Sequence, residues 1–204
     1  MTTIKPPTLF LMLAFTLGAG ARAQAAAPAK STLQTDLVGQ VGYVEKEILE
    51  LEDAVPQDKY TWRPAPGVRS ISEVYLHIAF GNYGLGKMIT GKAPPADAKF
   101  DGDAKKWDAQ TTDKAAIKKI LQTSFDYVRE AIKGVPEKDL DKEINFFGHE
   151  ITTRSGLITI INHEHEHLGQ SIAYARANNV TPPWSKGEKG EHAEKMEKAE
   201  KPKK

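Results

Sequence analysis

Residues 117–132, IKKILQTSFDYVREAI, carry the pattern that decides the fold. Large apolar side chains recur there at steps of three and four residues, which is the spacing of one face of an α-helix. They are Ile117, Ile120, Leu121, Phe125, Val128 and Ile132. Gly134 and Pro136 follow in the order that is usual at the end of a helix. The segment therefore predicts an amphipathic helix that buries one face.

Two further helices are predicted before this segment. The first ends at Pro56, which a helix interior does not accommodate. Its apolar positions are Leu37, Val41, Val44, Ile48 and Leu51. The loop at 62–67, WRPAPG, cannot continue a helix, because prolines and a glycine interrupt it. It leads into Ser70 and Glu73, whose spacing is that of a capping box, so the second helix starts there and runs to about Thr90.

A fourth helix is predicted from about Ser155 to Asn178. Each of the four helices has one apolar face and none is apolar all round, so we expect an all-α four-helix bundle with the apolar faces inward. The connection between the second and third helices, residues 91–111, is long and rich in Pro, Gly, Ala and Asp. A connection of that length lets the third helix run parallel to the second, which favours an up-down-down-up order.

The stretch between the third and fourth helices has no clear period. Phe146, Phe147 and Ile151 lie around Gly148 there. We interpret them as a lid or packing loop over one end of the bundle.

The first 23 residues have the composition of a signal peptide. Lys5 supplies a positive charge, residues 9–19 are mainly apolar, and Ala21-Arg22-Ala23 offers a small-x-small cleavage site. The apolar run is shorter than the ~20 residues that a membrane-spanning helix needs, so cleavage would leave no stable membrane anchor. This pattern predicts an exported protein, periplasmic or secreted.

The remaining boundaries follow from composition. Residues 24–34 are expected to be a flexible N-terminal segment and residues 35–184 to form the bundle. Residues 185–204 are rich in Lys and Glu and have almost no large apolar side chain. Burial there cannot offset the entropy lost on ordering, so we expect a disordered tail.

Charge and cysteine content exclude several classes of function. The chain has 28 Lys and Arg against 27 Asp and Glu, a formal net charge of +1. Summed charge therefore gives no attraction toward nucleic acid or an acidic lipid surface. The sequence has no cysteine, which excludes disulfides, thiolate metal sites and a cysteine nucleophile. Any bound metal must be held by His, Asp or Glu.

The fourth helix carries the sequence His163-Glu164-His165-Glu166-His167. Residues four apart on a helix are separated by only ~40° around the axis and ~6 Å along it, so His163 and His167 can reach one ion. They lie at the edge of the apolar arc, whereas His165 points elsewhere. Two histidines at the border of a bundle core are a usual place for a metal.

His77 on the second helix is the candidate for a third ligand. Gly81 and Gly84 follow it on the same side of that helix. A glycine inside a helix costs roughly 1 kcal/mol relative to alanine, which suggests that something else needs the missing side-chain volume. Space for an ion and a small ligand would explain both glycines, as would close packing of two helices.

Three segments together resemble the DinB-like superfamily. They are residues 62–71 (WRPAPGVRSI), His77-Ile78-Ala79, and His163-x-x-x-His167-x-Gly169-Gln170. The resemblance extends over about residues 35–184. It implies a four-helix bundle with the up-down-down-up order, often a homodimer, that holds one divalent metal with a histidine from the second helix and two from the fourth. Those positions are His77, His163 and His167 here.

The resemblance also implies the activity classes to consider. Characterised relatives include enzymes that transfer a low-molecular-weight thiol and thiol-dependent isomerases. Three neutral imidazoles leave a metal ion its double charge and an open position, as in catalytic zinc sites. Zn, Ni, Mn and Fe all accept such ligands. We therefore expect a metal-dependent transferase, for thiol transfer, or a hydrolase acting on a small-molecule substrate. The alternative is a non-catalytic metal-binding or interaction module.

A zinc protease is a third hypothesis. Residues 163–167 match the H-E-x-x-H pattern, with Glu164 as the general base and a weak candidate for a catalytic residue. We favour it less, because only the Lys- and Glu-rich tail could supply the downstream ligand of such proteases, and no strand pattern is available to pair with a peptide. Glu164, and Gln170 one turn beyond His167, could instead support the metal ligands from behind.

Overall fold

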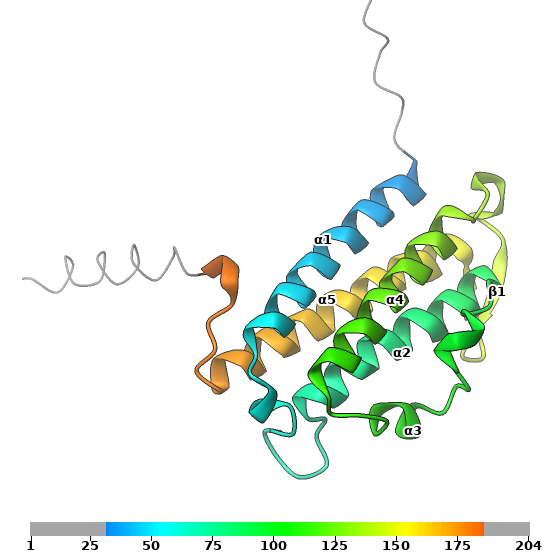
Figure 1. The fold of residues 1–204 in the computed structure, drawn as a ribbon. Coiled ribbons are helices and arrows are strands. Elements are labelled where there is room, and N and C mark those ends of the chain that lie inside the picture. Colours follow the sequence, from blue (N-terminus) through cyan, green and yellow to red (C-terminus); the bar gives the residue numbers. More distant parts are fainter. Residues whose placement is uncertain (1–31, 186–204) are drawn as a thin grey trace, which may run out of the picture. The chain divides into compact units, whose positions relative to one another are not determined.

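The fold is known from a computed structural model, which describes residues 32–185. The predicted signal peptide and almost all of the predicted tail lie outside the described residues. Within residues 32–185 the model has four long α-helices, one short one and a two-stranded sheet (Figure 1). Their bounds are α1 Leu33–Ala54, α2 Ile71–Thr90, α3 Ala104–Asp108, α4 Lys114–Lys133, β1 Glu143–Phe146, β2 His149–Thr152 and α5 Thr153–Ala177. All four predicted helices are present.

The start of α2 shows how the sequence sets a helix boundary. Ser70 accepts a hydrogen bond from the backbone of Glu73, and the Glu73 carboxylate accepts one from the backbone of Ser70. This is the reciprocal arrangement of a capping box. At the other end Gly91 takes a left-handed conformation with φ of 74° and closes the helix. The capping box thereby fixes the register in which His77 lies on α2.

The helix directions follow from contacts at the two ends of the bundle. The loop after α1 is bonded to the start of α2, since the backbone of Ser72 donates to the Tyr60 carbonyl over 2.9 Å. The start of α4 lies at the same end, because the Gln57 side chain bonds the Thr112 carbonyl over 2.8 Å. At the opposite end Gln34 bonds the Val135 carbonyl just after α4. α2 and α4 therefore run parallel, and the up-down-down-up order is confirmed (Figure 1).

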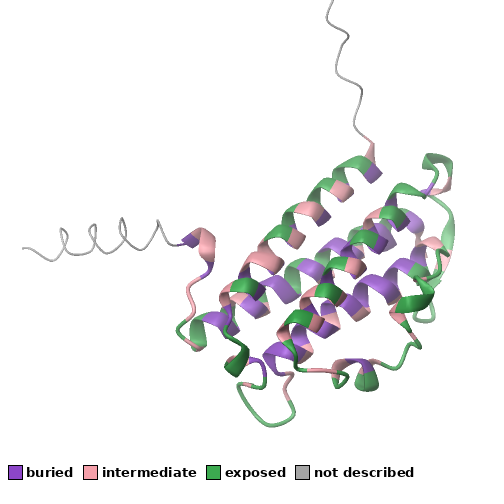
Figure 2. Ribbon diagram, viewed as in Figure 1, coloured by how far each residue is buried: buried purple, intermediate pink, exposed green. Residues whose placement is uncertain are grey.

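The apolar faces of the long helices meet in one core. α1 and α2 each contact both α4 and α5, so α1 lies diagonally opposite α2. Buried residues occupy the faces that the helices turn toward one another (Figure 2). Fully buried apolar residues from the four helices include Val41, Ile48, Leu76, Ile78, Leu121, Phe125, Leu157 and Ile160. No helix among residues 32–185 combines the length and the hydrophobicity needed to cross a membrane.

Two elements were not expected from the sequence. The stretch interpreted as a lid or packing loop is a β-hairpin, in which Phe146 pairs with His149 across a two-residue turn. The turn residues Phe147 and Gly148 both have positive φ, of 51° and 88°, as in the mirror-image turns that suit the twist of a hairpin. The second element is α3, a short helix in the long connection between α2 and α4. Both lie next to the histidines discussed below.

Candidate metal centre

The antiparallel packing of α2 on α5 brings three histidines together. His77 comes from α2, and His163 and His167 come from successive turns of α5. Each histidine offers one ring nitrogen as a ligand, and these three nitrogens lie within 4.8 Å of one another. His165, in contrast, is exposed on the other side of α5. The structure thus places His77 beside the two histidines that helical spacing selected and leaves out His165, which spacing rejected.

Gly81 makes this approach possible. A Cβ atom built on Gly81 would lie 2.1 Å from Cε1 and 2.6 Å from Nδ1 of His163, which is far closer than real contacts. The imidazole of His163 therefore lies directly against the bare backbone of α2. Gly84, one turn on, is different, because a Cβ there would meet only the Phe100 ring at 3.5 Å. Gly81 thus accounts for the close packing of a histidine, whereas an alanine at residue 84 would only reach ordinary contact with Phe100.

A chain of hydrogen bonds orients His167. The Gln170 amide donates from Nε2 to the Tyr174 hydroxyl over 3.1 Å, which directs its Oε1 toward His167. That oxygen accepts from Nδ1 of His167 over 2.9 Å. With the proton on Nδ1, the lone pair of Nε2 is available as a ligand. The expected position of Gln170 behind a histidine is therefore observed.

An acidic residue that the sequence did not reveal lies behind His77. Asp108, at the end of α3, places Oδ1 3.9 Å from Nδ1 of His77, and neither atom has a hydrogen-bond partner. The other carboxylate oxygen accepts from Nε of Arg69 over 2.7 Å. The side chains of His77 and Asp108 are only 17% and 14% exposed. Arg69 thus holds Asp108 in place. A small movement from this position would let Oδ1 of Asp108 accept a hydrogen bond from Nδ1 of His77.

Burial keeps the imidazoles of His77 and His163 neutral. It lowers the pKa of His77 to about 3, and the nearby Arg69 cation lowers it further in the same direction. Burial is also the main cause that lowers the pKa of His163 to about 4, with His167 and Arg69 contributing. Burial raises the pKa of Asp108, against the opposing effect of Arg69. Unprotonated imidazoles at neutral pH are the form that binds metal.

The spacing between two of the ligand nitrogens fits one ion. Nε2 of His77 lies 3.4 Å from Nε2 of His163. Two nitrogens that are each about 2.0–2.1 Å from a tetrahedral zinc ion are about 3.3–3.4 Å apart. Nδ1 of His163, like that of His77, is buried without a hydrogen-bond partner. The donor set, the spacing of this pair and the neutral state of His77 and His163 therefore suit a divalent transition metal.

Comparison with known proteins agrees with this geometry. Residues 40–171 match the family model of the DinB superfamily. The chain belongs to the DinB superfamily. It is 25% identical over 131 residues to uncharacterized protein YjoA of Bacillus subtilis (strain 168), covering 62% of this chain and 79% of YjoA.

Two crystal structures of DinB-like proteins share the fold. The one from Bacillus cereus ATCC 10987 has a TM-score of 0.59 and 24% identity, and the alignment covers 72% of this chain and 93% of that one. YjoA from Bacillus subtilis has a TM-score of 0.56 and 23% identity, with the same coverage of 72% and 93%. At this level of identity the likeness concerns the bundle itself.

Glu164 has no access to the candidate site of this DinB-superfamily chain. It is fully buried, and both carboxylate oxygens lack a hydrogen-bond partner. Burial raises its pKa well above the ordinary value, although Arg129 acts in the opposite direction. Glu164 also does not line the cleft beside the histidines. A general base must reach the substrate or its water, so this placement disfavours the protease hypothesis.

The cleft lies along α2 and α5 and has a volume of about 800 Å³. His77 and His163 form part of its wall, and Gly81 and Gly84 lie along α2 within it. The connection between α2 and α4 and the tip of the hairpin supply its other walls. This DinB bundle therefore places its histidines beside a cleft of the size that holds small molecules.

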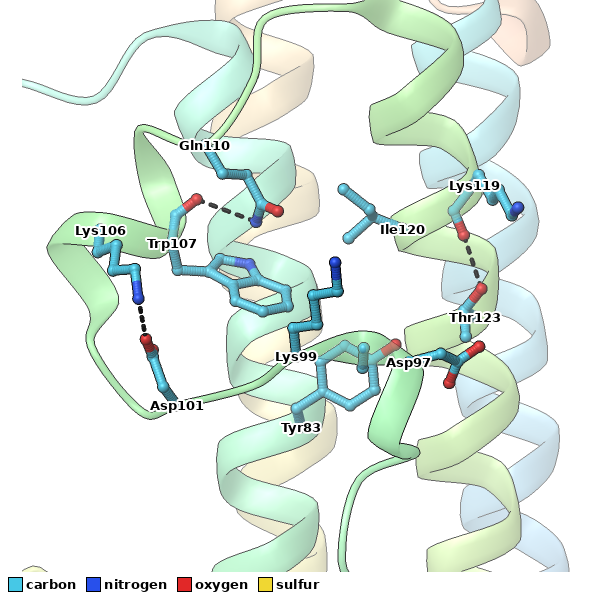
Figure 3. A pocket seen from close by; sticks show the side chains of 11 residues that line it. Tyr83, Asp97, Lys99, Asp101, Lys106, Trp107, Gln110, Lys119, Ile120 and Thr123 are labelled. Carbon is cyan, nitrogen blue, oxygen red and sulfur yellow. Dashed lines mark hydrogen bonds and ion pairs between the residues drawn. The ribbon is translucent and has the colours of Figure 1, made fainter.

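A second hollow, of about 520 Å³, is lined by residues of α2, of the α2–α4 connection and of α4 (Figure 3). Lys99 projects into it beside Trp107 and Tyr83, and Lys106 is paired with Asp101 at its rim (Figure 3). None of the three histidines lines this hollow. Of the two cavities described above, only the cleft between α2 and α5 borders the candidate metal centre.

Proposed function

We propose that this protein holds a divalent metal ion with His77, His163 and His167 and uses it to act on a small molecule in the adjoining cleft. The observation that carries the proposal is the placement of three ligand nitrogens, from two helices, within 4.8 Å of one another. The proposed reaction is a group transfer, with a low-molecular-weight thiol as the cosubstrate, or a hydrolysis. Zn, Ni, Mn and Fe are the candidate ions.

The protein's own residues would prepare the site before any ion arrives. Burial holds His77 and His163 in the neutral form. Gln170 fixes the proton of His167 on Nδ1, and Asp108 stands behind Nδ1 of His77. Partners of this kind orient histidine ligands and raise their basicity. Little reorganisation would then be needed on binding.

A divalent ion at this place would supply Lewis acidity, which polarises a bound carbonyl or stabilises a bound thiolate or hydroxide. The side chains of the cleft would position the ligand and shield it from water. His77 and His163 form one wall of the cleft, so a ligand bound there lies against them. The apolar walls exclude water from the reacting group, which strengthens every electrostatic interaction inside. The thiol-transfer form of the proposal is supported by membership of the DinB superfamily and by the absence of a cysteine in the chain.

The decisive experiment is metal analysis of the purified chain beside single variants. His77→Ala, His163→Ala and His167→Ala should each lose metal affinity by about 10-fold or more. His165→Ala is the matched control, because His165 lies in the same turn of α5 but is exposed and apart from the cluster. Retention of metal by all three variants, or equal loss in the control, would contradict the proposed site.

Turnover separates an enzyme from a module in which the ion only braces α2 against α5. The metal-loaded protein should act on members of thiol-transfer, ester and amide substrate panels, and His163→Ala should remove that activity. Stoichiometric metal with no turnover in any panel would favour the bracing role. The composition of residues 1–23 supports export, and the intact mass of the chain recovered from its host would test it.

A further inference from the structure

We infer that the cleft beside the histidines binds an apolar molecule with one metal-coordinating head group, and that Phe147 at the hairpin tip forms the wall for its tail. For the head group the inference rests on the metal site proposed above. For the tail it rests on the cleft alone. Its basis is the contrast between the histidines and the mainly apolar side chains that line the rest of the cleft.

Apart from the histidines and glycines, the cleft is lined mainly by apolar side chains, namely Phe80, Leu85, Met88, Phe100, Phe146 and Phe147. The other polar side chains of the cleft are Lys87, Thr159, Asn162 and Glu166, of which Lys87, Asn162 and Glu166 are exposed. The three histidine nitrogens are the only convergent group of possible metal ligands found among residues 32–185. A ligand complementary to this surface has a polar group at one end and an apolar chain or ring system beyond it.

Two glycines of α2, Gly81 and Gly84, line the cleft. The imidazole of His163 fills the space that a side chain at residue 81 would need, whereas a Cβ at residue 84 would come no closer than 3.5 Å to the Phe100 ring. Past His163 the cleft continues along α2 beside Gly84, Leu85 and Met88. A tail can therefore lie along this part of α2.

The exposure and the backbone conformation of Phe147 point to a ligand. Its side chain is 69% exposed and yet lines the cleft. Its φ of 51° lies in the left-handed region, which Asn and Gly adopt more readily than an aromatic residue. Apart from an edge-to-face contact with the Phe146 ring, at 4.8 Å between ring centroids, the fold gains little from a phenylalanine at this turn position, since its side chain is mostly exposed and its backbone is not relaxed. Strained residues of this kind are found at sites that clamp a ligand.

The experiment uses straight-chain alkyl hydroxamates, from butanoyl to decanoyl, as probes in isothermal titration calorimetry. A hydroxamate supplies the metal-coordinating head, and the chain length varies the tail. In the metal-loaded protein the affinity should rise about two- to fourfold for each added methylene until the chain outgrows the cleft. Phe147→Asn should flatten this dependence. Tyr43→Asn is the matched control, because Tyr43 is an exposed aromatic residue on α1 that does not line the cleft.

A stability measurement separates a ligand-binding role from a structural one. Urea unfolding of Phe147→Asn should give a midpoint equal to or above that of the parent, because Asn tolerates the left-handed conformation. If Phe147→Asn unfolds, Met88→Gln provides the same test, since it keeps a good helix former on α2 while making the cleft wall polar. Equal affinities for all chain lengths, or equal effects of Phe147→Asn and Tyr43→Asn, would overturn the inference.

Two further measurements separate a failure of the apolar site from a failure of the metal site. The metal-free protein should bind the probes more weakly but with the same dependence on chain length. If the protein binds no metal and the dependence persists, the metal proposal fails while the apolar site stands. If metal binds and the dependence is absent, the apolar site fails. The other possible occupant of the cleft is a second copy of this chain. Sedimentation of the parent and of Phe147→Asn tests it, because loss of a dimer in the variant, with probe binding unchanged, would assign Phe147 to the contact with that copy.

Discussion

The imidazole of His163 lies where a side chain at residue 81 would have to be. A Cβ on Gly81 would come within 2.1 to 2.9 Å of three atoms of that ring. Gly81 of α2 and His163 of α5 therefore form a single structural unit. This relationship explains why α2 has glycine at a position where alanine would give a more stable isolated helix.

Gly81→Ala is the most direct test of that unit. The added methyl group must displace His163, so we expect metal affinity to fall by about 10-fold or more. Gly39→Ala on α1 is the control, because a Cβ there meets nothing within 4 Å. The control should bind metal normally and gain up to about 1 kcal/mol in unfolding free energy from helix propensity. Competition titration with a metal-binding dye measures the first effect and urea unfolding the second.

The sequence predicted the parts of the fold and site that depend on helical periodicity. The four long helices and the pairing of His163 with His167 follow from spacings of three and four residues. The helix order followed from the length of the connection at 91–111, and His77 was added as a third ligand from the two glycines that follow it and through the family resemblance. Asp108 could not be found in this way, because the connection from α2 to α4 has no period and α3 has only five residues. The hairpin was missed because its turn carries Phe147-Gly148 in place of the usual Asn-Gly. These missed elements form the surroundings of the histidines.

Asp108→Asn tests the residue behind His77. The substitution keeps the size of the side chain but removes the negative charge that faces Nδ1 of His77. We expect a loss of about 10-fold in metal affinity, within the range found when partners of metal-ligating histidines are changed. Asp101→Asn is the matched control, since Asp101 lies in the same connection but pairs with the exposed Lys106. Comparable losses in both variants would show that charge in this segment acts generally and that Asp108 has no particular role.

Glu164→Gln separates a buried structural residue from a catalytic base. Burial raises the pKa of Glu164 well above its ordinary value, so the folded state keeps a proton that the unfolded state releases above about pH 4.5. The parent protein is therefore destabilised as pH rises through that range. Glutamine cannot lose this proton, and the variant should gain stability relative to the parent as pH rises above about 4.5, as measured by urea unfolding. Metal content and any turnover should be unchanged, whereas loss of peptide cleavage would revive the protease hypothesis.

The metal-free protein should lose stability in acid through its histidines. The pKa values of His77 and His163 are lowered to about 3 and about 4 in the folded state, against about 6.5 for an unfolded chain. Below about pH 6.5 the unfolded state therefore binds more protons than the folded state. Each group then lowers the unfolding free energy by up to about 1.4 kcal/mol per pH unit until its folded pKa is reached.

Urea unfolding of the metal-free parent and of a His77→Gln, His163→Gln double variant, at a series of pH values from 7.5 to about 4, measures this effect. Carboxylates titrate in both proteins at the lower end of the range, so the difference between the two curves isolates the imidazoles. That difference should grow as pH falls from about 6.5 and should favour the variant, because glutamine takes up no proton in either state. Parallel curves would mean that the two imidazoles protonate as readily in the fold as in water, which is incompatible with their burial between α2 and α5.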